Sequence, residues 1–171
     1  MTTTTDSPPA SASNGDLIRW AFAQLNKRDA TPLRRFWTDS TVQRFPDRTC
    51  HGADEIAAYF DEVFAALPDF HMEVVDLVEQ GEHVFVQWHL TGTHTGGPIQ
   101  GIDPTGRPIA VDGMDHFVMR DGKTVTNFIV FDQLQWARQV GFLPEDGTAA
   151  DKVAKAAFNG KGKLMQRLKR V

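Results

Sequence analysis

The stretch DHFVMRDGKTVTNFIVFD, residues 115–132, alternates between apolar and polar residues on both sides of a single turn. Such alternation is typical of two antiparallel strands, and Asp121-Gly122 favours the tight turn that joins them. One aspartate begins the stretch and another ends it, at Asp115 and Asp132. The sequence therefore predicts a hairpin with a carboxylate on each of its two strands.

The register of this hairpin predicts which face each aspartate occupies. With Arg120 opposite Lys123, a regular ladder places Asp115 opposite Phe128, and it puts Asp115 and Asp132 on one largely apolar face. Asp132 then lies four residues beyond Phe128, a rise of about 13 Å, so the carboxylates line opposite ends of one cavity and do not share a proton. A β-bulge would bring them closer or turn one of them outward.

The two aspartates are candidate acid/base residues. A carboxylate among apolar side chains loses hydration, which raises its pKa towards the range useful for proton transfer. Asp132 and Asp115 are therefore the predicted catalytic residues. Two structural alternatives stay open: Asp132 caps a helix beginning at Gln133, and Asp115 bonds to a nearby backbone amide.

The order of the predicted elements indicates an α+β fold. Helical spacing of apolar residues comes first, period-two alternation follows, and a short helix ends the pattern. Early helices would then cover one face of an antiparallel sheet of about four long strands. The expected helical segments are 16–28, 32–37, 53–67 and 133–140, and the expected strands are 70–79, 83–93, 108–120 and 123–132.

Length and composition indicate one globular domain. The chain has 171 residues, of which 41% are hydrophobic and 23% charged, and no apolar run approaches the roughly 18 residues that span a bilayer. We expect a disordered N-terminal tail over 1–13, the folded domain over 14–146 and a basic, partly helical tail over 147–171. Cys50 is the only cysteine, which excludes an internal disulfide, and a cytoplasmic location is expected by default.

The C-terminal tail concentrates positive charge. Residues 151–171 hold seven Lys/Arg and one acidic residue, a charge of +6, which leaves −10 for the rest of the chain. Such a tail suits nucleic acid, an acidic partner or anionic lipid, or it is a solvated appendage that pairs with its own acidic body. Aromatic residues do not interleave with the basic ones. We favour the solvated appendage, with no nucleic-acid and no membrane partner.

The sequence LTGTHTGGPIQGIDPTGRPIAVDGMDHFVMRDGKTV, followed by FDQLQWARQVG, resembles the SnoaL-like polyketide cyclases of the nuclear transport factor two and ketosteroid isomerase superfamily. The resemblance covers about residues 14–143. It implies a cone-shaped, curved antiparallel sheet covered by N-terminal helices, often dimeric, around an apolar pocket. It also implies ring closure by intramolecular aldol condensation without metal or cofactor, with the acid/base aspartate at Asp132 and a second, frequently acidic position at Asp115.

The chain departs from the family pattern at two places. A histidine-containing segment that often follows the second helix is Gln43-Arg44-Phe45-Pro46 here, and a common tryptophan before the aspartate is Phe128. Apolar pockets are lined mainly by aromatic side chains with a few polar groups. The predicted substrate-binding residues are Trp20, Arg44, Phe60, Phe64, Trp88 and Phe128.

The spacing of the histidines and of the single cysteine gives little support for a metal site or a nucleophilic residue. His83 and His89 share a strand face but stand about 20 Å apart, too far for one ion. Cys50 and His51 are adjacent in an extended segment, so their side chains point apart. We therefore expect no metal, and the resemblance implies no cofactor.

These patterns favour a cofactor-independent small-molecule enzyme that cyclises or isomerises an apolar, polyketide-like carbonyl substrate, acting as a homodimer. Two alternatives remain: a ligand-binding or interaction module without chemistry, and an epoxide hydrolase or dehydratase on the same fold. The enzyme hypothesis depends on a water-poor chamber that encloses the side chain of Asp132.

Overall fold

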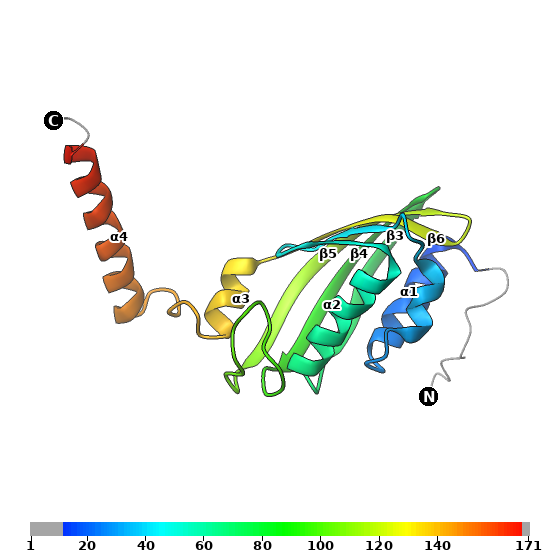
Figure 1. Ribbon diagram of the computed structural model, residues 1–171, viewed down its shortest axis with the longest axis horizontal. Coiled ribbons are helices and arrows are strands. Elements are labelled where there is room, and N and C mark those ends of the chain that lie inside the picture. The colour runs from blue at the N-terminus through cyan, green and yellow to red at the C-terminus, as the bar shows by residue number, and fades with distance from the viewer. Residues whose placement is uncertain (1–11, 169–171) are drawn as a thin grey trace.

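One curved sheet and two covering helices make up the body of the protein (Figure 1). The computed structural model describes residues 12–168, with side chains as far as residue 161. Within that range six strands form a single sheet in the order β2-β1-β6-β5-β4-β3. The elements are α1 (Asn14–Leu25), η1 (Thr31–Phe36), β1 (Val42–Arg44), β2 (Thr49–His51), α2 (Gly52–Ala66), β3 (His71–Gln80), β4 (His83–Thr93), β5 (Pro108–Arg120), β6 (Lys123–Phe131), α3 (Gln133–Gln139) and α4 (Ala149–Leu168).

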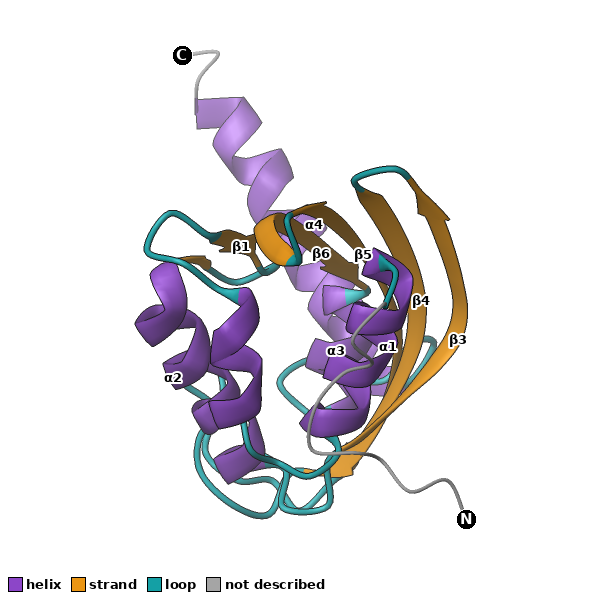
Figure 2. Ribbon diagram, turned by 90° about the vertical axis from the view of Figure 1, so that its right-hand side faces the viewer, coloured by secondary structure: helices purple, strands orange, loops and turns teal. Residues whose placement is uncertain are grey.

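The α+β class is confirmed, with a curved sheet that N-terminal helices cover and whose strands are antiparallel except where β1 pairs with β6 in parallel. Helices α1 and α2 lie on the concave side of the sheet, opposite its outer face (Figure 2). Helix α1 starts at a capping box in which the Ser13 hydroxyl accepts from the Asp16 amide and the Asp16 carboxylate accepts from the Ser13 amide. The apolar stripes of both helices are buried against the strands, and this burial forms the core.

A β-bulge in the β5–β6 hairpin corrects the predicted register. Arg120 pairs with Lys123 as expected, but the register shifts by one residue after Met119, and Asp115 pairs with Ile129 instead of Phe128. One extra residue in β6 reverses the faces of everything that follows it. Beyond the bulge β6 therefore turns Asn127, Ile129 and Phe131 inward, where the regular ladder had placed Thr126, Phe128 and Val130.

The C-terminal part extends beyond the body. Helix α4 projects away from the sheet on the far side of α3 (Figure 1). Its first turns are tied to the preceding segment because Lys155 Nζ donates to Asp146 at 2.9 Å, and within the helix the same group donates to Asp151 at 2.7 Å. Residues 1–11 of the predicted N-terminal tail lie outside the described residues. None of the described helices combines the length and the apolar character needed to span a membrane.

Candidate active site

A cavity of about 110 Å³ lies between the helices and the concave face of the sheet. On this measure a single water needs about 10–15 Å³, so the cavity has room for an organic molecule. Its walls are almost wholly apolar. The side chains with polar groups other than aromatic ones are Gln43, Gln100, Asp115, Thr124 and Asn127.

Asp115 is the one charged residue that lines the cavity among the residues the structure describes. It lies in the middle of β5 and is 7% exposed. Its Oδ1 accepts a hydrogen bond from Trp88 Nε1 at 2.8 Å, and its Oδ2 accepts one from Asn127 Nδ2 at 3.0 Å. Burial raises the pKa of Asp115 to about 6, and these two hydrogen bonds oppose the rise. The carboxyl is therefore poised to exchange a proton near neutral pH.

Gly113 gives Trp88 the space to reach Asp115. The two residues are paired across β4 and β5, and a Cβ on Gly113 would lie 2.2 Å from the Trp88 ring. No side chain tolerates that distance, so the indole lies directly over the glycine backbone. This close approach brings the indole N–H to the carboxylate two residues along the strand.

A row of polar side chains crosses the concave face beside Asp115. Asn127 in β6 holds the carboxylate, and Gln43 in β1 is paired with Asn127 in register. Gln43 and Asn127 are each 3% exposed. The Asn127 Oδ1 atom has no hydrogen-bonding partner within the described residues. Polar groups at this depth are normally satisfied, so the row is a candidate ligand-binding position.

Aromatic side chains close the cavity from the helix side and from the end of the sheet. Phe60 stacks on Trp37 and meets Phe45 edge to face. At the other end Phe131 contacts both Trp88 and Trp136. These rings are large, rigid and apolar, which suits a flat ligand with rings of its own.

Two of the predicted substrate-binding residues line the cavity and two lie behind it. Phe60 and Trp88 are in the wall. Trp20 packs against the lining residue Phe36, with ring centroids 5.7 Å apart, and Phe64 packs against Phe60 and Phe70. Trp20 and Phe64 therefore support the wall without forming part of it.

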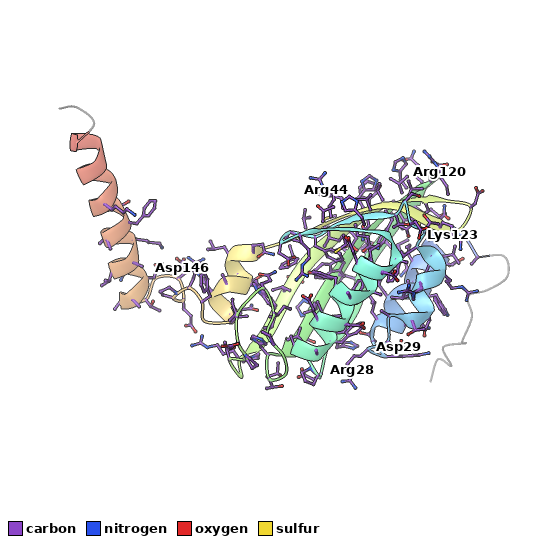
Figure 3. The ribbon with its side chains drawn as sticks, in the orientation of Figure 1. Arg28, Asp29, Arg44, Arg120, Lys123 and Asp146 are labelled. Carbon is purple, nitrogen blue, oxygen red and sulfur yellow. The ribbon has the colours of Figure 1, made fainter. Side chains whose placement is uncertain are left out.

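Asp132, Arg44 and Phe128 do not line the cavity, and their predicted placement there is wrong. Asp132 is exposed, and its Oδ1 accepts hydrogen bonds of 2.9 Å from the amides of Leu134 and Gln135, which caps α3. The bulge turned Phe128 to the outer face, where it is 47% exposed. Arg44 lies over its ring at 5.1 Å, on the side of the sheet away from the helices (Figure 3).

The remaining reactive side chains lie away from the cavity. His83 and His116 meet at 2.9 Å, and His89 meets Asp112 at 2.7 Å, on strand residues whose side chains alternate away from the cavity. Burial raises the pKa of the Cys50 thiol, which disfavours the reactive thiolate. The described residues contain no group of three side chains that would hold a metal ion. The absence of a cofactor stays a prediction.

Three site residues were not predicted from the sequence. Gln43 and Asn127 are ordinary polar residues in strands, and Asn127 was expected on the outer face. Gly113 left the clearest signal, because glycine inside a strand often marks the close approach of another group. The hydrogen bond from Trp88 to Asp115 follows from that glycine once the strand pairing is known.

Comparison with known proteins settles the family. The profile of the SnoaL-like polyketide cyclases matches residues 16–140, which is most of the chain. The chain belongs to the SnoaL-like polyketide cyclase family. A comparison with curated proteins gives no significant match. Membership of the SnoaL-like family agrees with the fold and with the apolar cavity, and it leaves the reaction and the substrate open.

Solved structures agree on the SnoaL-like fold. AclR from Streptomyces galilaeus, assigned as a hydroxylase, is 22% identical with a TM-score of 0.69, over 92% of this chain and 94% of its own. A SnoaL-like polyketide cyclase from Jannaschia sp. CCS1 is 22% identical with a TM-score of 0.70, over 82% and 99%. IdmH from Streptomyces antibioticus, assigned as a polyketide cyclase, is 24% identical with a TM-score of 0.65, over 76% and 99%. The AclR match extends past residue 140 into α4.

Proposed function

We propose that the protein is a cofactor-independent acid/base enzyme that cyclises or isomerises an apolar carbonyl substrate, with Asp115 as the residue that moves the proton. The single observation that carries the proposal is a buried carboxyl, pKa about 6, in the wall of an apolar cavity. A general base works best when its pKa lies near the operating pH. Asp132 is exposed and caps a helix, so the expectation that a water-poor chamber encloses it is wrong, and the proposal depends on Asp115 instead.

The chemistry follows from the position of Asp115. Its carboxylate removes a proton from the carbon next to a carbonyl, so the C–H bond breaks and its electron pair forms an enolate. The enolate carbon then attacks a second carbonyl of the same molecule and forms a C–C bond. The new alkoxide takes the proton back from Asp115. In an isomerisation the same proton returns to another carbon instead.

Trp88 and Asn127 are positioning residues in this proposal. Both donate to Asp115, one to each carboxylate oxygen, so they fix the direction in which the free lone pairs point. They also stabilise the ionised form against the effect of burial. Their donors oppose a further rise of the pKa, which would leave the carboxyl protonated and unable to act as a base at neutral pH.

Proton exchange on 2-tetralone tests the proposal without knowledge of the natural substrate. This neutral bicyclic ketone has acidic C–H groups next to its carbonyl, and ¹H NMR in D₂O follows their exchange. The unmutated protein should accelerate the exchange, with a rate that rises through pH 6 as Asp115 ionises. Asp115→Asn should lose the acceleration, by a factor of about 10² to 10⁴.

The matched control for this experiment is Asp132→Asn. The asparagine keeps the helix cap, and residue 132 lies outside the cavity, so exchange should continue at the unmutated rate. Equal exchange by Asp115→Asn and the unmutated protein would refute the assignment of Asp115. Loss of exchange in Asp132→Asn alone would transfer the role to that residue.

A homodimer that packs through the outer face of the sheet is part of the proposal. Phe85, Met114, Phe128 and Val130 lie on three neighbouring strands, and each is between 43% and 49% exposed. Met114 is paired directly with Val130, so the side chains form one apolar patch. Sedimentation velocity at two concentrations should show a dimer, and a monomer at both would refute it.

A further inference from the structure

Gln43 is a buried residue whose side-chain amide is open to the cavity. It is 3% exposed and lines the cavity, and its side chain makes no hydrogen bond with the described residues. Its amide atoms are not among the fully enclosed polar atoms that lack a partner. The amide is therefore accessible to a ligand that enters the cavity.

Strand pairing places this amide close to the proposed base. Gln43 is in register with Asn127, and Asn127 donates to Asp115. Gln43 and Asp115 therefore stand on strands separated by one other strand and are offset by two residues, because Asn127 pairs with Phe117, so their backbones lie roughly 11–12 Å apart. Both side chains lie on the concave face, and the space between their ends suits a carbonyl oxygen and the carbon next to it.

The charge of the cavity wall limits what the amide can bind. Among the described lining residues none is arginine, lysine or histidine, and the one charged group is Asp115. A carboxylate or phosphate in this cavity would lie near a second negative charge without a cation to balance it. A ligand group that meets Gln43 is therefore neutral, and a ketone or ester carbonyl accepts the amide N–H without any charge.

We infer that Gln43 is a catalytic residue whose Nε2 donates a hydrogen bond to the carbonyl oxygen of a neutral ketone or ester. The inference rests on the proposed function of Asp115. As Asp115 takes the proton from the neighbouring carbon, the electron pair of the C–H bond forms the C=C bond of the enolate. The carbonyl π electrons move onto the oxygen, which becomes negative next to the Gln43 N–H. A fixed donor aimed at that oxygen stabilises the enolate more than the ketone.

The matched control is a second buried glutamine that lies outside the cavity wall. Gln24 in α1 is 2% exposed, its Nε2 has no partner within the described residues, and it does not line the cavity. Methionine has nearly the shape of glutamine but no donor. Gln43→Met therefore removes an amide from the cavity wall, and Gln24→Met removes the same group outside that wall. Thermal unfolding verifies that both variants fold.

The first measurement observes the hydrogen bond without catalysis. In the Asp115→Asn background, 2-tetralone labelled with ¹³C at the carbonyl binds but does not react. We expect its carbonyl resonance to move downfield on binding to Asp115→Asn. The same shift should occur in the double variant that also carries Gln24→Met. With Gln43→Met the bound resonance should return to the value seen in an apolar solvent. An unchanged bound resonance in Gln43→Met would overturn the inference.

The second measurement uses the active protein and separates the two proposals. Gln43→Met should slow the α-proton exchange of 2-tetralone about 100-fold, mainly in kcat, while Gln24→Met leaves it unchanged. If the unmutated protein shows no exchange, the proposed function fails, and the ¹³C shift still tests Gln43. If exchange depends on Asp115 but not on Gln43, the inference fails alone. Absence of 2-tetralone binding at millimolar concentration would overturn the ligand class.

Discussion

Asp115 and Asp132 begin and end one hairpin, yet the fold gives them opposite environments. Asp115 is buried in the cavity wall and accepts two side-chain hydrogen bonds. Asp132 is exposed and accepts two backbone amides at the start of α3. Burial raises the pKa of the first carboxyl, whereas the second accepts the hydrogen bonds that cap a helix. The same side chain thus serves acid/base chemistry in one place and helix initiation in the other.

A single inserted residue separates these two environments. The bulge lies between the turn and the inner residues of β6, where Met119 pairs with Thr124 and Val118 already pairs with Thr126. Without it, the strand would present Phe128 and Val130 to the cavity and Asn127 to the outside. The bulge therefore brings Asn127 to Asp115, and it leaves Asp132 beyond the sheet at the helix start.

The largest expected effect is on the free energy of unfolding, and it distinguishes two adjacent residues of β6. Ile129 is 6% exposed and Val130 is 43% exposed, whereas a regular ladder would reverse them. Ile129→Ala should lower the free energy of unfolding by about 4 kcal/mol because it removes buried methyl groups and leaves a cavity. Measured below the concentration at which the proposed dimer forms, Val130→Ala should change it by at most about 0.5 kcal/mol. Urea denaturation measures both, and the opposite ranking would restore the regular register.

The next largest effect is the pH dependence of stability that the buried Asp115 causes. Burial raises the pKa of Asp115 from 3.8 to about 6. Below the unfolded value both states are protonated, so the contribution of the neutral carboxyl to stability is fully present. As the pH rises towards 6, the unfolded chain releases its proton first, and the contribution is lost. Between pH 4 and pH 7 the unmutated protein should lose about 2–3 kcal/mol relative to Asp115→Asn.

Each variant is compared with the unmutated protein at every pH, and Asp132→Asn is the control. Asp132→Asn keeps Asp115 and should therefore retain the loss of stability that Asp115 causes between pH 4 and pH 7. The difference between Asp115→Asn and the unmutated protein should level off above pH 7. A difference that does not depend on pH would mean that Asp115 ionises in the folded protein as it does in the unfolded chain.

The fold could be predicted from the sequence because its signals are local and repeated. Helical spacing, period-two alternation and the Asp121-Gly122 turn each agreed with the structure, within a few residues at the ends. The short pairing of β1 with β2 and with β6 was not predicted, since three-residue strands carry almost no periodic signal. The curvature of the sheet came from the family resemblance.

The site could be predicted only as far as the strand register allowed. The side chains of β5 alternate without interruption from the Asp121-Gly122 turn to Asp115, so the inward orientation of Asp115 was predicted correctly. β6 carries the extra residue, and every expectation beyond it was reversed, including those for Phe128 and Asn127. Nothing in the local sequence marks such an insertion, because both registers place apolar residues on each face.

The smallest effect concerns the cap. Asp132→Ala removes the acceptor of the Leu134 and Gln135 amides and should lower the free energy of unfolding by about 1 kcal/mol. Asp132→Asn keeps an acceptor and should lower it far less. Neither variant should alter the exchange of 2-tetralone, because the cap lies outside the cavity wall. If Asp132→Ala left stability unchanged but slowed exchange, the carboxylate at the helix start would belong to the reaction, and the division between the two aspartates would fail.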